Sequence, residues 1–145
     1  MTSIVVRGMT PDDLSAVAEL SAQLGYPCSR DDVARRFERI RSDRDHALLV
    51  AERGDLRIAG WIHLYLVHTL ESDSCAEIGG LVVDEHLRRQ GAGRALVAEA
   101  ERWARGRGLG RIRVRSNILR SEAHRFYPGI GYELRKTQHT YGKTL

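Results

Sequence analysis

The chain has 145 residues with 23 Lys and Arg against 19 Asp and Glu, and its 42% hydrophobic and 29% charged content excludes a disordered protein. At this length we expect a single domain over residues 1–145, and no apolar run approaches the roughly 18 residues that a membrane span requires. Two cysteines are too few for a disulfide framework and the chain does not begin with a secretory signal, so we expect a cytoplasmic protein without a metal site.

The N-terminal half predicts a strand, two helices and then three strands. Ser3–Arg7 is a short β-rich run, and a helix is predicted from an N-cap at Thr10 to a stop at Gly25. A second helix begins at Ser29, which has the spacing of a capping box with Asp32. Three apolar runs follow with short connections: His46–Glu52, Arg57–Val67 and Cys75–Asp84. Such short connections predict an antiparallel meander.

The C-terminal half predicts a crossover helix, a last helix and two final strands. Helical spacing covers Ala92–Arg107, and the alternating Arg111–Arg115 is a strand, so the crossover is expected to be parallel and right-handed. A last helix spans about Leu119–Tyr127 and is expected to stop at Pro128. Two short polar strands are predicted within Tyr132–Leu145. The order β-α-α-β-β-β-α-β-α-β-β indicates one α/β sheet of mixed direction.

Gly79 and Gly80 are unusual in the middle of a predicted strand. Glycine weakens a strand and commonly marks a bulge or a close approach of the backbone to another group. We therefore expect a bulged strand at this position. A glycine pair that only makes room for neighbouring side chains is the alternative.

The segment from Leu81 to Leu96 contains a strand, a Gly-rich turn and the start of a helix. Free N–H groups and the positive end of a helix dipole make an anion site there, and Gly91 and Gly93 remove side chains where a phosphate would approach. The turn lies in His86–Arg125, which holds 11 Arg and 3 Glu, a charge of +8 against −4 in the rest of the chain. The pattern predicts a pyrophosphate site, although it fits neither a Walker loop nor the dinucleotide fingerprint.

The run Arg88-Arg89-Gln90-Gly91-Ala92-Gly93 resembles the Gln/Arg-x-x-Gly-x-Gly/Ala motif of the GNAT superfamily of acetyl-CoA-dependent N-acetyltransferases. The preceding AEIGGLVVDE resembles the bulged fourth strand of that family, and SNILRSEAHRFYPGIGYE resembles its last helix. The element order also matches over nearly the whole chain. The resemblance implies a single GNAT-like domain whose bulged, splayed central strand and Gly-rich turn bind acetyl-CoA.

The resemblance implies a coenzyme site in three parts. The turn would surround the pyrophosphate with Arg88, Arg89, Gln90, Gly91, Ala92, Gly93 and Arg94. The bulged strand would bind the pantetheine arm and polarise the thioester carbonyl through main-chain groups of Leu81, Val82 and Val83. At the start of the last helix, Asn117 would contact a pantetheine amide, with Ser121 nearby. Asn117 equally suits the N-cap of that helix.

Tyr127 matches the tyrosine that protonates the departing thiolate in many GNAT members. A phenol with a pKa near 10 holds its proton at neutral pH and can give it to a forming thiolate. Packing at the end of the helix is the alternative role. Pro128 stands where Glu or Lys is more common in the family, so we expect a different shape at this helix end.

Glu77 aligns with a strand position that carries a catalytic glutamate in some histone-type members, where it takes the proton of the attacking amine. A regular strand would place Glu77 on the same face as Leu81, although a bulge between them would break that register. We expect burial to raise the pKa of this carboxyl. Pairing with an arginine across the sheet is an equal alternative, ordered water can also serve, and His63 and His124 are fallback bases.

Together these residues predict an acyltransferase that moves the acetyl group of acetyl-CoA to a primary amine of a small molecule or protein, by direct attack through a tetrahedral intermediate. A non-catalytic acetyl-CoA-binding regulator and a basic nucleic-acid-binding protein are the alternatives, the latter without a recognised module. We expect a cationic acceptor, no membrane partner and a homodimer, since many relatives dimerise through their last strands. The acidic residues that favour a cationic acceptor are Asp31, Asp32, Asp43, Asp45, Glu71 and Asp73.

Overall fold

The computed structural model describes residues 3–116 and 120–145. It divides into two compact units, Met1–Arg115 and Ser116–Leu145. The expectation of a single domain stays a prediction. Within the described residues, none of the helices combines the length and the apolar character that crossing a membrane requires.

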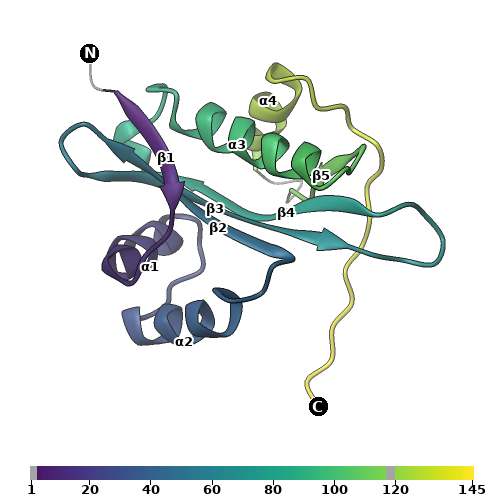
Figure 1. Ribbon diagram of the computed structural model, residues 1–145, viewed down its shortest axis with the longest axis horizontal. Coiled ribbons are helices and arrows are strands. Elements are labelled where there is room, and N and C mark those ends of the chain that lie inside the picture. Colours follow the sequence, from purple (N-terminus) through teal and green to yellow (C-terminus); the bar gives the residue numbers. More distant parts are fainter. Residues whose placement is uncertain (1–2, 117–119) are drawn as a thin grey trace. The chain divides into compact units, whose positions relative to one another are not determined.

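A five-stranded sheet with the order β1-β2-β3-β4-β5 forms the centre of the first unit (Figure 1). Its strands are β1 (Ile4–Gly8), β2 (His46–Arg53), β3 (Ile58–Val67), β4 (Cys75–Val83) and β5 (Ile112–Val114). The first four strands pair antiparallel, and β5 is parallel to β4. The sheet is therefore mixed, and it confirms the predicted α/β class, the antiparallel meander and the parallel crossover.

Helices cover both faces of this sheet. Figure 1 shows α1 (Leu14–Gln23) and α2 (Arg30–Ile40) on one face and α3 (Ala92–Gly106) on the other. A 3-10 turn, η1 (Pro11–Asp13), follows Thr10, so α1 begins three residues later than predicted. The capping box of α2 is confirmed: Asp32 N–H donates to Ser29 Oγ at 3.0 Å, and Ser29 N–H donates to Asp32 Oδ2 at 3.2 Å.

The core of the first unit lies on both sides of the sheet. Leu14 and Phe37 belong to the cluster between α1, α2 and the sheet, against which Trp61 of β3 packs. On the opposite side, Leu96 of α3 is fully buried, and its Cδ1 lies 3.3 Å from the position of a Cβ at Gly60. Burial of each large apolar side chain contributes about 1.5–3 kcal/mol, so this packing fixes α3 and the turn before it against the sheet.

A β-bulge interrupts β4 at the glycine pair. His63 of β3 pairs with Gly80, whereas the next residue, Leu64, pairs with Ile78, so Gly79 is the extra residue of the bulge. A bulge bends its strand and increases the local twist. The bulged central strand predicted from the sequence is thus confirmed.

Both glycines also make room for aromatic rings of β3. A Cβ at Gly79 would lie 2.6 Å from Cε1 of Tyr65, and a Cβ at Gly80 would lie 2.9 Å from Cη2 of Trp61. Side chains at these positions would displace the rings, because close-packed interiors do not tolerate such overlap. Both explanations of the glycine pair therefore apply: the two residues form a bulge, and they make room for neighbouring side chains.

The second unit contains α4 (Ser121–Gly129) and no strand among its described residues. Contrary to the prediction, α4 does not stop before Pro128 but includes it. The missing N–H removes a single bond in the last turn, where the helix is about to end. The two strands predicted within Tyr132–Leu145 are also wrong. A two-stranded hairpin needs an apolar face to be stable, and here Leu134 is 86% exposed.

Candidate functional site

A Gly-rich turn joins β4 to α3 and presents the start of that helix. Gly91 is the N-cap residue of α3, with φ 91° and ψ 2°, in the left-handed region that glycine adopts without strain. A Cβ at Gly91 would meet no described atom within 4 Å apart from its chain neighbours, so the space beside Gly91 is open among the described residues. The turn therefore offers the N–H groups and the open approach that an anion requires.

Three contacts fix the strand end of this turn. The buried carboxylate of Asp84 accepts a hydrogen bond from His86 N–H at 3.0 Å and pairs with Arg57 at 3.2 Å. Glu85 N–H donates to Gln23 Oε1 of α1 at 2.9 Å.

Within the turn, Arg89 has a positive φ of 65°, which is uncommon for a residue with a side chain. The exposed residues of the turn are Arg88, Arg89, Gln90, Gly91 and Arg94, whereas Ala92 is buried and Gly93 is half-buried.

Beyond the bulge, β4 has an edge that β5 does not cover. The β4–β5 pairing runs only from Ala76 opposite Ile112 to Ile78 opposite Val114. Within the first unit, no described strand pairs with residues 79–83 on that side. Main-chain N–H and C=O groups along such an edge can pair with another extended chain. Here that chain would lie along Leu81, Val82 and Val83.

On the face that α1 and α2 cover, four strands contribute a polar cluster beside the bulge. Its members are His46, His63, Tyr65, Glu77 and Arg113, from β2, β3, β4 and β5. His46 Nδ1 lies 2.9 Å from His63 Nε2, and the ring centroids of the two histidines and Tyr65 are 5.2–5.4 Å apart. The Tyr65 hydroxyl donates to Glu77 Oε2 at 2.5 Å, and Arg113 Nε donates to Glu77 Oε1 at 2.6 Å.

Glu77 is held in its charged form. Burial by itself would raise its pKa, but the hydrogen bonds from Tyr65 and Arg113 and the charge of Arg115 outweigh that effect, and the pKa is lowered. The expected rise is therefore wrong, and the alternative, an arginine paired with Glu77 across the sheet, is confirmed. Because the bulge lies between them, Glu77 and Leu81 also do not share a face of the sheet.

The two histidines differ in their access to water. Burial lowers the pKa of His63 to about 4, with a further contribution from the neighbouring His46, so His63 is neutral at neutral pH. His46 is 29% exposed, and its Nε2 lies 3.8 Å from Asp43 Oδ2. His46 also lines a cavity of about 260 Å³ between the end of β1, α2 and the start of β2. The cluster therefore extends from the interior beside the bulge to water.

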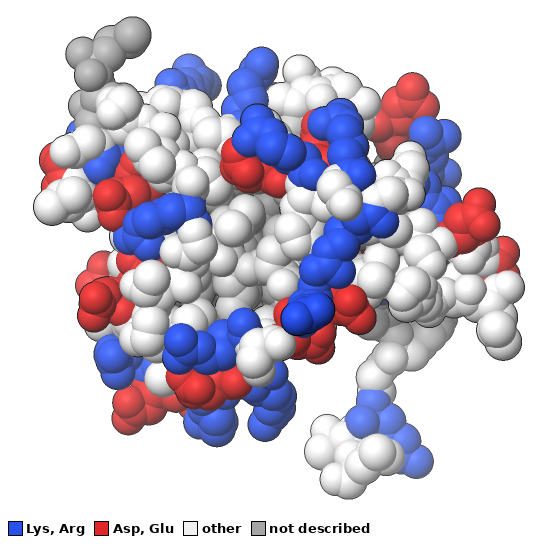
Figure 2. All heavy atoms as spheres, in the orientation of Figure 1, with Lys and Arg blue, Asp and Glu red and all other residues white. Residues whose placement is uncertain are grey.

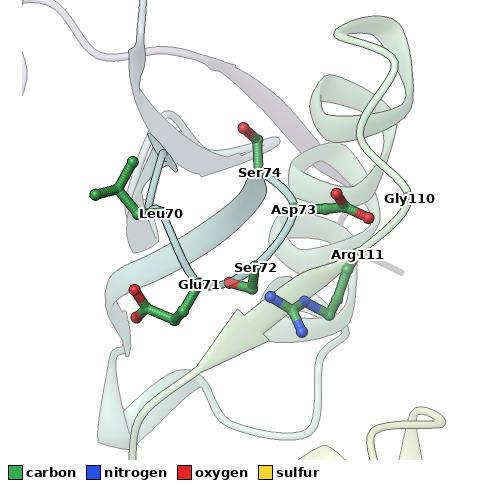
Figure 3. A pocket seen from close by; sticks show the side chains of 7 residues that line it. All are labelled: Leu70, Glu71, Ser72, Asp73, Ser74, Gly110 and Arg111. Atoms are coloured by element: carbon green, nitrogen blue, oxygen red, sulfur yellow. The ribbon is translucent and has the colours of Figure 1, made fainter.

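A larger cavity lies at the far end of β4. It measures about 730 Å³ and is lined by Leu70, Glu71, Ser72, Asp73, Ser74, Gly110 and Arg111. Figure 3 shows the β3–β4 loop on one side of this cavity and the chain leading into β5 on the other. Cys75 and Gly79 are four residue steps apart along β4, so roughly 13 Å separates this cavity from the bulge.

Tyr127 belongs to α4 of the second unit. Its ring centroid lies 5.1 Å from that of Phe126 and 5.7 Å from that of Tyr132. Burial raises the pKa of Tyr127 to about 12, so the phenol keeps its proton at neutral pH. Ser121 is the exposed first residue of α4, and Asn117 lies outside the described residues. Among the described residues, no three His, Cys, Asp or Glu side chains are grouped to hold a metal ion.

Residues 14–132 match the model of the acetyltransferase (GNAT) family. The chain belongs to the GNAT family. It is 31% identical over 134 residues to the aminoalkylphosphonate N-acetyltransferase of Salmonella typhimurium, which covers 88% of this chain and 84% of the relative. It is 27% identical over 132 residues to the aminoglycoside N(6')-acetyltransferase type 1 of Stenotrophomonas maltophilia, covering 88% of this chain and 85% of the relative.

Solved structures show the same fold. The aminoglycoside N-acetyltransferase AAC(6')-Iy in complex with CoA has a TM-score of 0.86 at 17% identity, over 100% of this chain and 97% of that chain. A transcriptional regulator from Bacillus halodurans also has a TM-score of 0.86, at 24% identity over 97% of this chain and 100% of that chain. The GNAT fold and the acyltransferase class predicted from the sequence are thus confirmed.

In this GNAT acyltransferase the sequence missed most of the polar cluster. Glu77 and His63 were singled out, but His46, Tyr65 and Arg113 were not. One signal was present: Trp61, His63 and Tyr65 recur at every second residue of β3 and so share a face. Their contacts with β2, β4 and β5 depend on strand register and on the bulge, which the sequence does not state.

Proposed function

We propose that this GNAT acyltransferase moves the acetyl group of acetyl-CoA to a primary amine of a small molecule or a protein. The observation that carries the proposal is a pair of features in one unit: the open turn at Gly91 and the uncovered edge of β4 beyond the bulge. The turn suits the pyrophosphate of the coenzyme. The edge suits its extended pantetheine arm, whose amides can pair with the strand.

The turn supplies charge as well as N–H groups for the coenzyme. Three exposed arginines, Arg88, Arg89 and Arg94, belong to it. A guanidinium suits phosphate oxygens because its planar donors can bind two of them at once. In the proposed site, main-chain N–H groups of Gly91, Ala92 and Gly93 bind the pyrophosphate, and the three arginines and Gln90 surround it.

The proposed reaction is a direct attack on the thioester. The amine lone pair forms a C–N bond with the carbonyl carbon, and the resulting oxyanion is stabilised by an N–H near Leu81 or Val82, a contribution of roughly 3 kcal/mol. The C–S bond then breaks, and the thiolate takes the proton of Tyr127. Burial raises the pKa of Tyr127 to about 12, so the phenol carries its proton over the physiological range.

We propose a cationic amine as the acceptor. The relatives are named for an aminoglycoside and an aminoalkylphosphonate, and both carry amines. Two carboxylates, Glu71 and Asp73, line the cavity at the β3–β4 loop. Two other acidic residues of the expected set pair with arginines: Asp32 with Arg35 at 3.2 Å and Asp45 with Arg107 at 3.4 Å. Figure 2 shows basic and acidic side chains side by side over α2, so support for a cation comes from the β3–β4 loop.

Release of free thiol from acetyl-CoA tests the proposal. The purified chain is incubated with acetyl-CoA and, in turn, an aminoglycoside, an aminoalkylphosphonate, spermidine and a lysine peptide. We expect amine-dependent thiol release with at least one of them, and its loss in Gly91→Glu. Acetyl-CoA binding without thiol release from any amine would instead favour the non-catalytic regulator.

Two further expectations accompany this function. We propose a homodimer, supported by the exposed Leu134, Tyr141 and Leu145 of the C-terminal segment, and sedimentation velocity tests it. A single species of 16.3 kDa at micromolar concentration would contradict it. A cytoplasmic location stays a prediction.

A further inference from the structure

The structure assigns the amine's proton to a different group from Glu77. We infer that His63 and His46 form a relay that takes this proton beside the bulge of β4 and releases it to water at the cavity between β1, α2 and β2. The inference rests on the proposed acetyl transfer. It adds two residues to the reaction, His63 as the catalytic base and His46 as the group that carries the proton away.

His63 lies directly opposite the bulge. Its pairing partner on β4 is Gly80, and the Cα atoms of opposed residues in an antiparallel pair are about 4.5–5.5 Å apart. Gly80 has no side chain, and the N–H groups proposed to polarise the thioester belong to the next residues of the same strand, Leu81 and Val82. The proposed relay includes one water molecule between the amine and the imidazole of His63.

The other titratable groups of the polar cluster are poor proton acceptors. Both oxygens of Glu77 already accept hydrogen bonds, one from Tyr65 and one from Arg113. Tyr65 donates its proton to Glu77, and burial with this hydrogen bond raises the pKa of Tyr65 to about 12. His63 is neutral and therefore has a lone pair available. Because burial disfavours a proton on His63, the proton has to pass on to His46 in the same step.

In the proposed relay, His46 carries the proton from His63 to solvent. His63 Nε2 and His46 Nδ1 are 2.9 Å apart, a distance at which they share one proton. When an N–H bond of the ammonium breaks, the bridging water gives a proton to His63, and the shared proton moves to His46. His46 then releases its Nε2 proton into the 260 Å³ cavity that it lines, and Asp43 Oδ2 lies 3.8 Å from this nitrogen. Exchange with solvent restores the starting tautomers.

Comparing two kinds of nucleophile distinguishes a relay of protons from a purely structural role of the two histidines. Spermidine and the other alkylamines of the panel are protonated at neutral pH and must lose a proton, whereas hydroxylamine is largely unprotonated. We expect His63→Gln to lower kcat for the alkylamine that the wild type acetylates fastest by ~100-fold, and His46→Gln by ~10-fold. Hydroxylamine-dependent thiol release, corrected for the rate without protein, should change by less than about threefold. His68→Gln, at an exposed histidine near the β3–β4 loop, is the control and should match the wild type.

The possible outcomes distinguish the relay, a structural role of the histidines and a failure of the proposed acetyl transfer. Equal losses for both nucleophiles would overturn the relay and indicate that the histidines only maintain packing. Unchanged alkylamine turnover in His63→Gln, or wild-type activity with hydroxylamine alone, would overturn it as well. If the wild type releases no thiol with any nucleophile, the proposed function fails and the relay with it. Calorimetry with acetyl-CoA should give the same affinity in all four proteins, which excludes loss of coenzyme binding as the cause.

Discussion

Replacing Glu77 by Gln should lower the free energy of unfolding considerably, although the two side chains have nearly the same shape. Glu77 is 6% exposed and accepts two short hydrogen bonds, one from the guanidinium of Arg113 and one from the hydroxyl of Tyr65. Gln keeps an oxygen for one donor but loses the charge that both donors face. Arg113 then remains in the sheet, one third exposed, without its carboxylate partner.

The magnitude follows from these contacts. A hydrogen bond to a charged group contributes about 1.5–3 kcal/mol, and removing one partner of a fully buried ion pair costs about 3–5 kcal/mol. Because Arg113 is partly exposed to water, we expect a value below the buried range, ~2 kcal/mol at neutral pH. The matched control is Glu38→Gln, which removes an exposed ion pair with Arg41 on α2 and should cost at most ~0.5 kcal/mol.

Urea unfolding at several pH values measures this difference. The pKa of Glu77 is lower in the folded state than its ordinary 4.5, so its contribution is complete above that value and is lost as the pH falls through the folded pKa. The gap between the wild type and Glu77→Gln should therefore be constant near neutral pH and narrow from about pH 5 downward. Equal stabilities at pH 7, or a gap that stays constant into acid, would refute the structural account of Glu77.

Three other substitutions test separate parts of the account. Gly91→Glu should abolish acetyl-CoA binding in calorimetry, because it puts a negative side chain at a φ of 91° in the proposed pyrophosphate site; wild-type affinity would contradict that site. Tyr127→Phe should lower turnover by ~100-fold with little change in coenzyme affinity, and unchanged turnover at every pH would remove its role as acid. Gly80→Ala should lower the free energy of unfolding by ~1–3 kcal/mol, because its Cβ would lie 2.9 Å from Trp61, whereas Gly106→Ala, which meets nothing within 4 Å, should not; equal stabilities in urea unfolding would contradict the packing explanation.

Local patterns in the sequence predicted most of the first unit. Ser29 and Asp32 form a capping box within four consecutive residues, and Gly79 and Gly80 mark their bulge by being glycines in an apolar strand. The Gly-rich turn is equally local, since strand, glycines and helix follow one another. Features of this kind need no knowledge of distant residues, so the sequence is sufficient for them.

Features that depend on distant partners were the ones missed. The pKa of Glu77 was expected to rise with burial, but its sign is decided by Arg113, a residue 36 positions away on a neighbouring strand. His46 and His63 meet only because β2 and β3 pair in one particular register. The strands expected within Tyr132–Leu145 failed for a related reason: a two-stranded hairpin is stable only when an apolar face packs against other parts of the fold.

Transfer of a labelled acetyl group is the most direct test of the central claim. The chain is incubated with acetyl-CoA that carries a trideuterated acetyl group, together with each amine of the panel, and the amines are analysed by mass spectrometry. We expect at least one amine to gain the deuterated acetyl group in the presence of the wild type and none to gain it with Gly91→Glu. Unmodified amines throughout, despite tight binding of acetyl-CoA by the wild type, would contradict it.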